Sequence, residues 1–295
     1  MTKYDFIGRK TIWFAFSTAV IAIGLAALIV KGLTFGIEFK GGTMFEAKFA
    51  KSQEVSQVRT AVTVLGLSDA VIQKAGLRGI VIRTHELSVA KQQSVKDALV
   101  KMGAKDFRIQ GVGASWGARL TEGTLVALLV SLIVVLGFIA VRFEFKMGVA
   151  GVVALVHDVL VALGIYALFG REVTTSTVAA FLTILGYSLY DTIVIFDRVR
   201  ENAPHMKQQT YSDMVNHSIN QSLRRSINTS LTSIIPVACI LVFGGDTLKD
   251  FAFALLVGLA SGAYSSIFIA SPILALWKET EPKYKSVRRK LAKAS

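Results

Sequence analysis

The sequence predicts an α-helical membrane protein with six spans and a small folded domain outside the membrane. Of its 295 residues, 53% are hydrophobic and only 18% are charged, and the mean hydropathy is +0.54. These values are too apolar for an ordinary water-soluble domain of this length. Uncharged runs also recur along the chain, each long enough to cross about 30 Å of hydrocarbon at about 1.5 Å per residue.

Six such runs are predicted to span the membrane. They cover residues 11–33, 123–141, 147–169, 173–196, 227–245 and 251–277. Lys and Arg are concentrated in the connections on one side and in the tail, so both termini are expected in the cytoplasm. The expected parts are the N-terminus and first span (1–34), an exterior domain (35–122), spans two to six (123–277) and a basic tail (278–295).

The exterior segment has the pattern of a compact α+β domain. Alternating or β-rich stretches occur at 43–49, 69–74, 79–84 and 106–112. Two helical patterns lie between them, SQEVSQVRTAVTVLG and LSVAKQQSVKDALVKMG, and each ends at a glycine. The order βαββαβ predicts a ferredoxin-like sheet with two helices on one face.

The fourth run carries a carboxylate, Asp191, before its apolar part has ended. Thr183, Tyr187 and Asp191 are spaced by four residues, so they share one face of a helix. Asp at the centre of a span is unfavourable by about 2.5 to 3.5 kcal/mol, and intramembrane ionisable groups usually mark ion or proton paths. Asp191 is therefore the first candidate for a proton-carrying residue.

A second polar stripe opens the fifth run, at Arg225, Asn228, Thr229 and Thr232. If the two helices pack together, Arg225 is expected to face inward and approach Asp191 within ion-pair distance. Burial favours a neutral carboxyl and a nearby guanidinium favours the carboxylate, so a helix movement would load or release a proton. The same pair would equally suit a static link between two helices, or a scaffold, and the residues alone leave these readings open.

Other polar residues give weaker indications. Asp158 in the third run is a further candidate for the polar interior and the proton path, whereas His157 is expected to be a packed histidine with a hydrogen-bond partner. No metal site or cofactor is predicted, and Cys239 is expected in the core. The net charge of +13 does not predict nucleic-acid binding, because the basic residues lie at the ends of apolar runs and in the tail.

Small residues form a ridge on the sixth run. Gly258, Gly262 and Ser266 recur every four residues, which lets membrane helices approach closely. The ridge is expected to pack either within this chain or against a second subunit.

Five motifs, in order, resemble the SecF family of protein-export membrane proteins. They are GIEFKGG at 36–42, HD at 157–158, GYSLYDTIVIFDRVREN at 186–202, SLRRSINTSLTSIIPV at 222–237 and YSSIFIASP at 264–272. Gly36, Glu38, Gly41 and Gly42 belong to the first motif, and the two adjacent glycines are expected to form a hinge. Glu38 stands where the family usually has Asp, and Tyr190 stands where it usually has Asn.

The resemblance implies an accessory subunit of the cytoplasmic (inner) membrane, not an enzyme. Such a subunit works with SecD and the SecYEG channel, with YajC as a further candidate partner, and uses the proton-motive force to promote export of unfolded secretory polypeptides. The family belongs to the resistance-nodulation-division transporters, and its proton-path residues fall on Asp191 and Arg225. The alternative is half of a proton-driven lipid or small-solute exporter of that type. An intramembrane aspartyl protease is disfavoured because no GxGD motif is present.

Overall fold

The computed structural model describes residues 4–206, 209–244 and 246–287. The chain divides into two compact units. One, the helical unit, comprises the described parts of Met1–Thr34, Leu128–Arg171 and Ser176–Ser295. The other comprises Phe35–Ala127 together with Glu172–Thr175 and is called the exterior unit after its predicted location.

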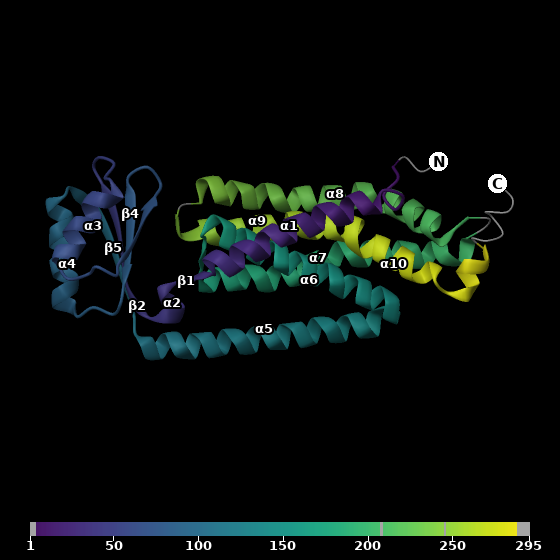
Figure 1. Ribbon diagram of the computed structural model, residues 1–295, viewed down its shortest axis with the longest axis horizontal. Helices are drawn as coiled ribbons and strands as arrows, with labels where there is room; N and C mark the ends of the chain where they lie inside the picture. Colours follow the sequence, from purple (N-terminus) through teal and green to yellow (C-terminus); the bar gives the residue numbers. More distant parts are fainter. Residues whose placement is uncertain (1–3, 207–208, 245, 288–295) are drawn as a thin grey trace. The chain divides into compact units, whose positions relative to one another are not determined.

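Long helices build the helical unit. They are α1 (Lys10–Lys31), the part of α5 (Ala114–Arg142) from Leu128 onward, α6 (Phe145–Phe169), α7 (Thr175–Asn202), α8 (Tyr211–Phe243) and α9 (Asp246–Ser265), the last continued by a π-helical turn, η2 (Ser266–Ala270), and by α10 (Ser271–Glu279). Within the described residues, six helices are long and apolar enough to cross a membrane, which confirms the predicted number of spans. The chain is therefore a multi-pass membrane protein. Helix α1 packs against α6, and α9 packs against both α6 and α8 (Figure 1).

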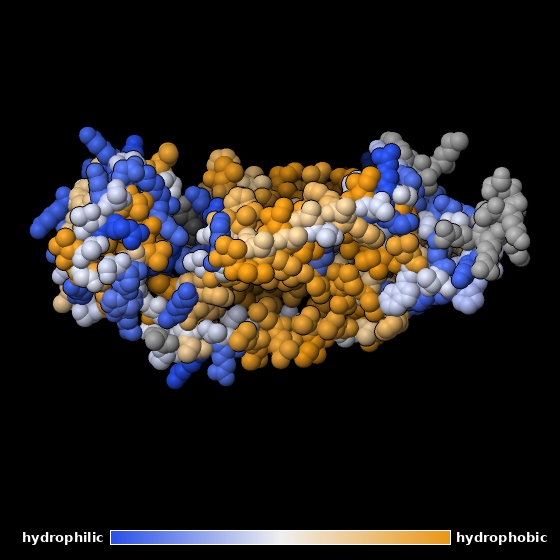
Figure 2. All heavy atoms as spheres, viewed as in Figure 1, coloured by the Kyte–Doolittle hydropathy of each residue, from blue (hydrophilic) through white to orange (hydrophobic). Residues whose placement is uncertain are grey.

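The surface of the helical unit is suited to lipid. Figure 2 shows a broad hydrophobic face over the helices, and large apolar side chains such as Ile29, Val141 and Phe243 are exposed. Cys239 on α8 is exposed as well, so the prediction of a core cysteine was wrong. In a membrane span both the lipid-facing surface and the protein interior are apolar. Hydrophobicity alone therefore does not predict which of the two a small apolar residue will occupy.

Helix α8 begins well before the predicted fifth span at residue 227. A capping box explains this start: the Thr210 hydroxyl accepts from the Asp213 backbone N–H at 3.1 Å, and the Asp213 carboxylate accepts from the Thr210 N–H at 3.2 Å. The first turns then bury Tyr211, Met214 and Ile219 in the core of the helical unit. The uncharged run therefore marks only the later part of a longer helix.

The exterior unit contains the elements β2 (Gly42–Phe49), α3 (Val55–Val64), β3 (Val71–Ala75), β4 (Gly79–Thr84), α4 (Val89–Lys101) and β5 (Ala104–Val112). They follow the βαββαβ order expected from the sequence, with bounds that differ by at most a few residues. The sheet order is β3-β4-β2-β5, and all neighbouring strands are antiparallel. Alternate residues of β2, Phe45 and Ala47, are fully buried together with Val58 of α3 and Leu99 of α4. Both helices therefore contribute to one core with the sheet.

Short elements flank this sheet. Strand β1 (Thr34–Phe35) precedes α2 (Ile37–Lys40), and β6 (Glu172–Val173) lies in the connection between α6 and α7. The Gly36 N–H donates to the Val173 carbonyl at 3.0 Å, and Arg83 of β4 forms an ion pair with Glu172. The connection Glu172–Thr175 is thereby fixed to the exterior unit.

Candidate functional site

The helical unit buries two carboxylates within its spans, Asp158 on α6 and Asp191 on α7. Their exposed fractions are 0% and 2%. A buried charge is strongly unfavourable unless hydrogen bonds or an opposite charge compensate it. The partners of each carboxylate therefore decide what each one can do.

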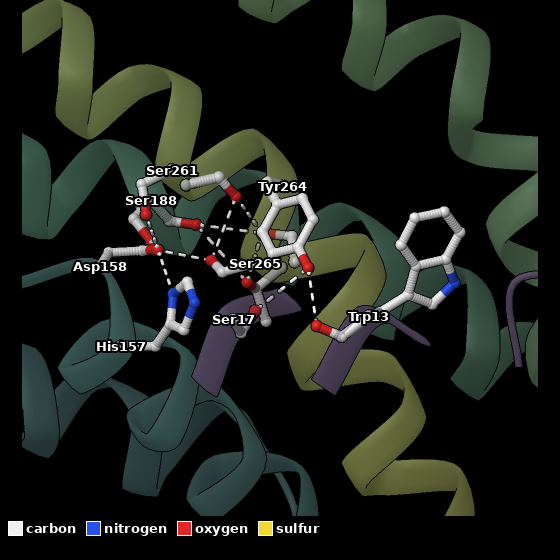
Figure 3. A network of polar contacts seen from close by, with 11 residues as sticks. Trp13, Ser17, His157, Asp158, Ser188, Ser261, Tyr264 and Ser265 are labelled. Carbon is white, nitrogen blue, oxygen red and sulfur yellow. Dashed lines mark hydrogen bonds and ion pairs between the residues drawn. The ribbon is translucent and has the colours of Figure 1, made fainter. Parts of the chain in front are cut away.

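Asp158 is the centre of a dense network of hydrogen bonds (Figure 3). Its Oδ2 accepts from the hydroxyls of Ser188 at 2.5 Å and Ser265 at 2.7 Å. Its Oδ1 accepts from the Ser261 hydroxyl at 2.6 Å and lies 3.0 Å from Nδ1 of His157. Three hydroxyl donors and one ring nitrogen surround a single carboxyl group. Asp158 thus joins the polar interior, as the sequence suggested.

The network extends from Asp158 to α1. His157 is buried and stacks on Tyr264, with ring centroids 6.0 Å apart. The Tyr264 hydroxyl donates to the Trp13 carbonyl at 3.0 Å and lies 3.1 Å from the Ser17 hydroxyl. His157 is therefore a packed histidine with a hydrogen-bond partner, as predicted. The described residues contain no group of three or more His, Cys, Asp or Glu side chains placed to hold a metal ion.

Asp191 has a much sparser environment at the contact between α7 and α8. Its Oδ2 accepts from the Ser230 hydroxyl at 3.2 Å, and the buried Ser226 hydroxyl, one turn earlier on α8, lies near the same carboxylate without a well-formed hydrogen bond. Tyr187, one turn before Asp191, donates to the Thr229 carbonyl at 3.0 Å and bonds to the Ser233 hydroxyl at 2.6 Å. The stripe containing Tyr187 and Asp191 therefore faces α8, while Thr183 at its start is exposed.

Arg225 lies elsewhere than the sequence predicted. Its side chain is exposed, and its Nη2 donates to the Tyr190 hydroxyl at 3.1 Å. Both side chains lie among the described residues, and no ion pair joins Arg225 to Asp191 there. The prediction that Arg225 faces inward was thus wrong for this chain without a partner subunit.

Helix α8 instead turns a row of serines toward the bundle. Ser218, Ser222, Ser226 and Ser230 recur every four residues and are buried, whereas Asn228 and Thr232 are exposed and Thr229 is half-buried. Both faces of this helix carry polar residues at helical spacing, and the prediction from the sequence selected the Arg225 stripe and missed the serine stripe. Small hydroxyl side chains allow closer helix packing than arginine does, and a preference for small residues would have selected the serine face.

The ridge on the sixth span packs against α7 within this chain. A Cβ on Gly258 would lie 2.2 Å from Cδ1 of Ile184, and one on Gly262 would lie 3.0 Å from Cβ of Ser188. The Ser266 hydroxyl lies 2.7 Å from that of Thr192. Of the two alternatives that the sequence left open, the ridge therefore packs within this chain and not against a second subunit. The close approach of α9 to α7 brings Ser188, Ser261 and Ser265 to the carboxylate of Asp158.

A π-helical turn interrupts the sixth span at Ser266–Ala270. The Ser271 hydroxyl donates to the Ser266 carbonyl at 2.7 Å, which satisfies one of the backbone groups freed by the wider turn. Single π-turns inside helices occur frequently at functional sites. No sequence pattern predicted this turn, because its serines fit an α-helical ridge equally well.

The motif GIEFKGG lies in the exterior unit. Gly41 and Gly42 have φ angles of 74° and 137°, and a Cβ on Gly42 would lie 2.4 Å from the Thr84 carbonyl oxygen. Both conformations favour glycine. Glu38 accepts from the backbone N–H of Thr175 at 2.6 Å, and Gly36 bonds to the connection before Thr175. The motif is thus held to the connection between α6 and α7 by hydrogen bonds. That Gly41 and Gly42 act as a hinge stays a prediction.

Comparisons with known proteins agree with this arrangement. Residues 92–280 match the family described as protein export membrane protein SecD/SecF, C-terminal, and residues 26–53 match the SecD/SecF GG motif. The chain belongs to the SecF family. It is 39% identical to the protein translocase subunit SecF of Streptomyces coelicolor, over 98% of this chain and 80% of that protein. It is also 39% identical to the protein translocase subunit SecF of Magnetococcus marinus, over 93% of this chain and 92% of that one.

Solved structures of SecDF share the fold of this SecF-family chain. SecDF from Thermus thermophilus, described as a translocon-associated membrane protein, is 34% identical with a TM-score of 0.88 over 94% of this chain. This chain spans 39% of that SecDF chain. A SecDF structure in a super-membrane-facing form gives a TM-score of 0.68 at 32% identity over 99% of this chain.

Proposed function

We propose that this chain is an accessory subunit of the Sec protein translocase that works with SecD. In this proposal it uses the proton-motive force to promote export of unfolded secretory polypeptides through SecYEG. Two kinds of comparison support the role: relatives named protein translocase subunit SecF over nearly the whole chain, and a SecDF described as translocon-associated. SecD, which supplies the other six-span half, is the expected partner, and YajC is a further candidate.

The observation that carries the proton-coupled part is Asp191. It is buried in a span, yet among the residues that the structure describes its one well-formed hydrogen bond is from the Ser230 hydroxyl, at 3.2 Å. A carboxylate with so few donors changes protonation with little loss of hydrogen bonding. A charge moved across 100 mV is worth about 2.3 kcal/mol, which is enough to bias a helix shift. We assign proton binding to Asp191.

Arg225 supplies the second element of the coupling. Its guanidinium is held by the Tyr190 hydroxyl at 3.1 Å, on the residue next to Asp191 in the chain. A movement of α8 along α7 would exchange Tyr190 for the Asp191 carboxylate as the partner of Arg225. That exchange favours the deprotonated carboxylate and so links proton release to helix position. In this scheme Asp158 holds the helices and does not carry the proton.

The exterior unit completes the proposal. Its strand order and antiparallel pairing support a ferredoxin-like assignment. We place this unit outside the cytoplasmic membrane with both termini inside, following the distribution of Lys and Arg. An edge strand of its sheet, β3 or β5, would receive an extended segment of the exported polypeptide, and movement about the GIEFKGG junction would release that segment.

The test compares Asp191→Asn with Asp197→Asn, a carboxylate near the cytoplasmic end of the same helix that pairs with Arg142 at 2.7 Å. Both variants are assembled with SecD and SecYEG in vesicles, and export of a secretory protein is measured with and without a proton gradient. Asp191→Asn should insert and assemble normally and lose the gradient-dependent stimulation, while ATP-driven export continues. Asp197→Asn should keep most of the stimulation.

Two results would contradict the proposal. Full gradient-dependent stimulation with Asp191→Asn would leave a static pair or a scaffold as the role of this region. Gradient-driven movement of a lipid or small solute by the same vesicles, without any effect on protein export, would instead favour the exporter alternative.

A further inference from the structure

A groove runs along α8, between the segment that precedes α1 and the α9–η2 region. It consists of two adjoining cavities of about 310 and 450 Å³. The two cavities share Tyr4, Leu223 and Ile227 as lining residues, so they form one continuous depression. The combined space is within the range of ligand sites in proteins.

One end of the groove is polar and positively charged. The smaller cavity is lined by Arg224, Asn220 and Asn228 in addition to the shared residues, and none of its lining residues is acidic. Arg224 is exposed and has no hydrogen bond or ion pair with any residue that the structure describes. Asp5, which follows Tyr4 in the chain, accepts from the Gly8 backbone N–H at 2.8 Å and does not line the cavity. The guanidinium is thus available to an anion.

The other end of the groove is apolar. The larger cavity is walled mainly by hydrophobic side chains, among them Phe6, Leu231, Ile267 and Phe268. Arg224 and Leu231 are seven residues apart on α8, which corresponds to about 10 Å along the helix axis at about 1.5 Å per residue. The groove therefore places a cation at one end and about 10 Å of hydrocarbon surface beyond it.

We propose that this groove binds an anionic phospholipid. The phosphate of the headgroup pairs with Arg224, and one acyl chain lies over Leu223, Ile227 and Leu231 toward Ile267. Arg224 precedes the uncharged run that starts at residue 227, which is where a headgroup meets a span. The basic end excludes a cationic ligand, and the apolar end is unfavourable for water, which would find few polar partners there. This inference does not depend on proton coupling.

The experiment measures lipid retention on the full chain in detergent by native mass spectrometry. Phosphatidylglycerol is the anionic probe and phosphatidylcholine the zwitterionic one. Wild type should retain one phosphatidylglycerol in preference to phosphatidylcholine. Arg224→Gln should weaken retention of phosphatidylglycerol by about tenfold, the factor expected for loss of one charge-assisted contact.

A matched control removes the same charge elsewhere. Lys285 is exposed and lies outside the residues that line the groove, so Lys285→Gln should retain the lipid as wild type does. Ala263→Trp fills the apolar cavity and should weaken both lipids. If Ala263→Trp does not fold, judged by circular dichroism, the exposed Arg224→Gln and Lys285→Gln still decide the matter.

Several results would overturn the site. Equal retention by wild type and Arg224→Gln would exclude the headgroup contact, and equal weakening by Lys285→Gln would indicate only non-specific attraction to anionic lipid. Displacement of phosphatidylglycerol by inorganic phosphate at similar concentration would make Arg224 an anion site without a lipid chain. Loss of the lipid on addition of a six-span partner would assign the groove to a protein interface.

Discussion

The two buried carboxylates of the helical unit differ in what surrounds them. Asp158 accepts from the hydroxyls of Ser188, Ser261 and Ser265 and contacts Nδ1 of His157, all within 3.0 Å. Asp191 receives one well-formed hydrogen bond from the described part of the chain, from the Ser230 hydroxyl at 3.2 Å. Both lie in spans and both are almost completely buried. Burial by itself therefore does not identify a proton carrier, and the proposal rests on the number of donors, which differs between the two carboxyl groups.

This difference follows from which helices meet at each carboxylate. Asp158 of α6 faces α7 and α9, whose close contact at Gly258 and Gly262 presents three serines to one carboxyl group. Asp191 faces α8, which offers Ser230 and keeps Arg225 on Tyr190. We infer that Asp158 fixes the packing of α6, α7 and α9 and that Asp191 leaves α8 free to shift.

The largest effect is expected on replacing the saturated carboxylate. Asp158→Asn puts an amide NH₂ among groups that already donate, and it removes the charge that compensates them. We expect a loss of roughly 3 to 5 kcal/mol in the free energy of unfolding, whereas Asp191→Asn should lose less than about 1.5 kcal/mol. Unfolding in mixed micelles measures both. Equal losses would remove the distinction between the two sites.

Single hydroxyl deletions sharpen the same comparison. Ser265→Ala removes a donor to Asp158 at 2.7 Å and should cost about 1.5 to 3 kcal/mol, the range for hydrogen bonds to charged groups. Ser230→Ala removes the donor to Asp191 at 3.2 Å and should cost about 1 kcal/mol or less. Both are serine-to-alanine changes at buried positions, so each serves as the control for the other. A larger loss for Ser230→Ala would reverse the assignment.

The glycine ridge tests whether helix approach produces the Asp158 cluster. Gly258→Ala brings a Cβ against Ile184 and should destabilise the helical unit by about 1 to 3 kcal/mol through overpacking. Gly186→Ala is the control, because nothing lies within 4 Å of a Cβ there, and it should be neutral or slightly stabilising. Thermal unfolding of both variants in detergent is the measurement. A neutral Gly258→Ala would mean that the α7–α9 contact is adaptable.

The smallest effect is expected at a carboxylate outside the spans, which serves as a hydrated reference. Lys146 lies 3.0 Å from Glu281, and this bond, aided by Lys278, holds the pKa of Glu281 below its usual range. The stabilisation is therefore present at neutral pH and is lost as the pH falls through the lowered pKa. Glu281→Gln should cost less than about 1 kcal/mol at neutral pH and nothing in acid. A difference that persisted in acid would point to packing.

Much of the architecture could be predicted from the sequence. Uncharged length predicted six spans, and alternation with glycine-terminated helical patterns predicted the elements of the exterior unit. Asp191 was identified because a charge inside an apolar run is conspicuous. Each of these inferences uses a property that a short segment carries by itself.

What escaped prediction depends on pairs of segments. Periodicity showed that Arg225 and Thr229 share one face of α8, and this face was predicted to turn inward, whereas the face of Ser226 and Ser230 is the buried one. The donors to Asp158 come from α7 and α9, far apart in the sequence. These donors converge because the glycine ridge of the sixth span packs on Ile184 and Ser188 of α7. The sequence pattern did not decide whether that ridge packs within this chain or against a second subunit.

Infrared spectroscopy of the full chain most directly tests the claim that Asp191 changes protonation while Asp158 does not. Difference spectra between acidic and alkaline buffer, with isotopically labelled aspartate, report the carbonyl band of a protonated carboxyl group. The account predicts a pH-dependent band that disappears in Asp191→Asn and persists in Ser265→Ala, whose Asp158 environment is altered. A band that persists in Asp191→Asn and shifts in Ser265→Ala would assign the proton to Asp158 and contradict the account.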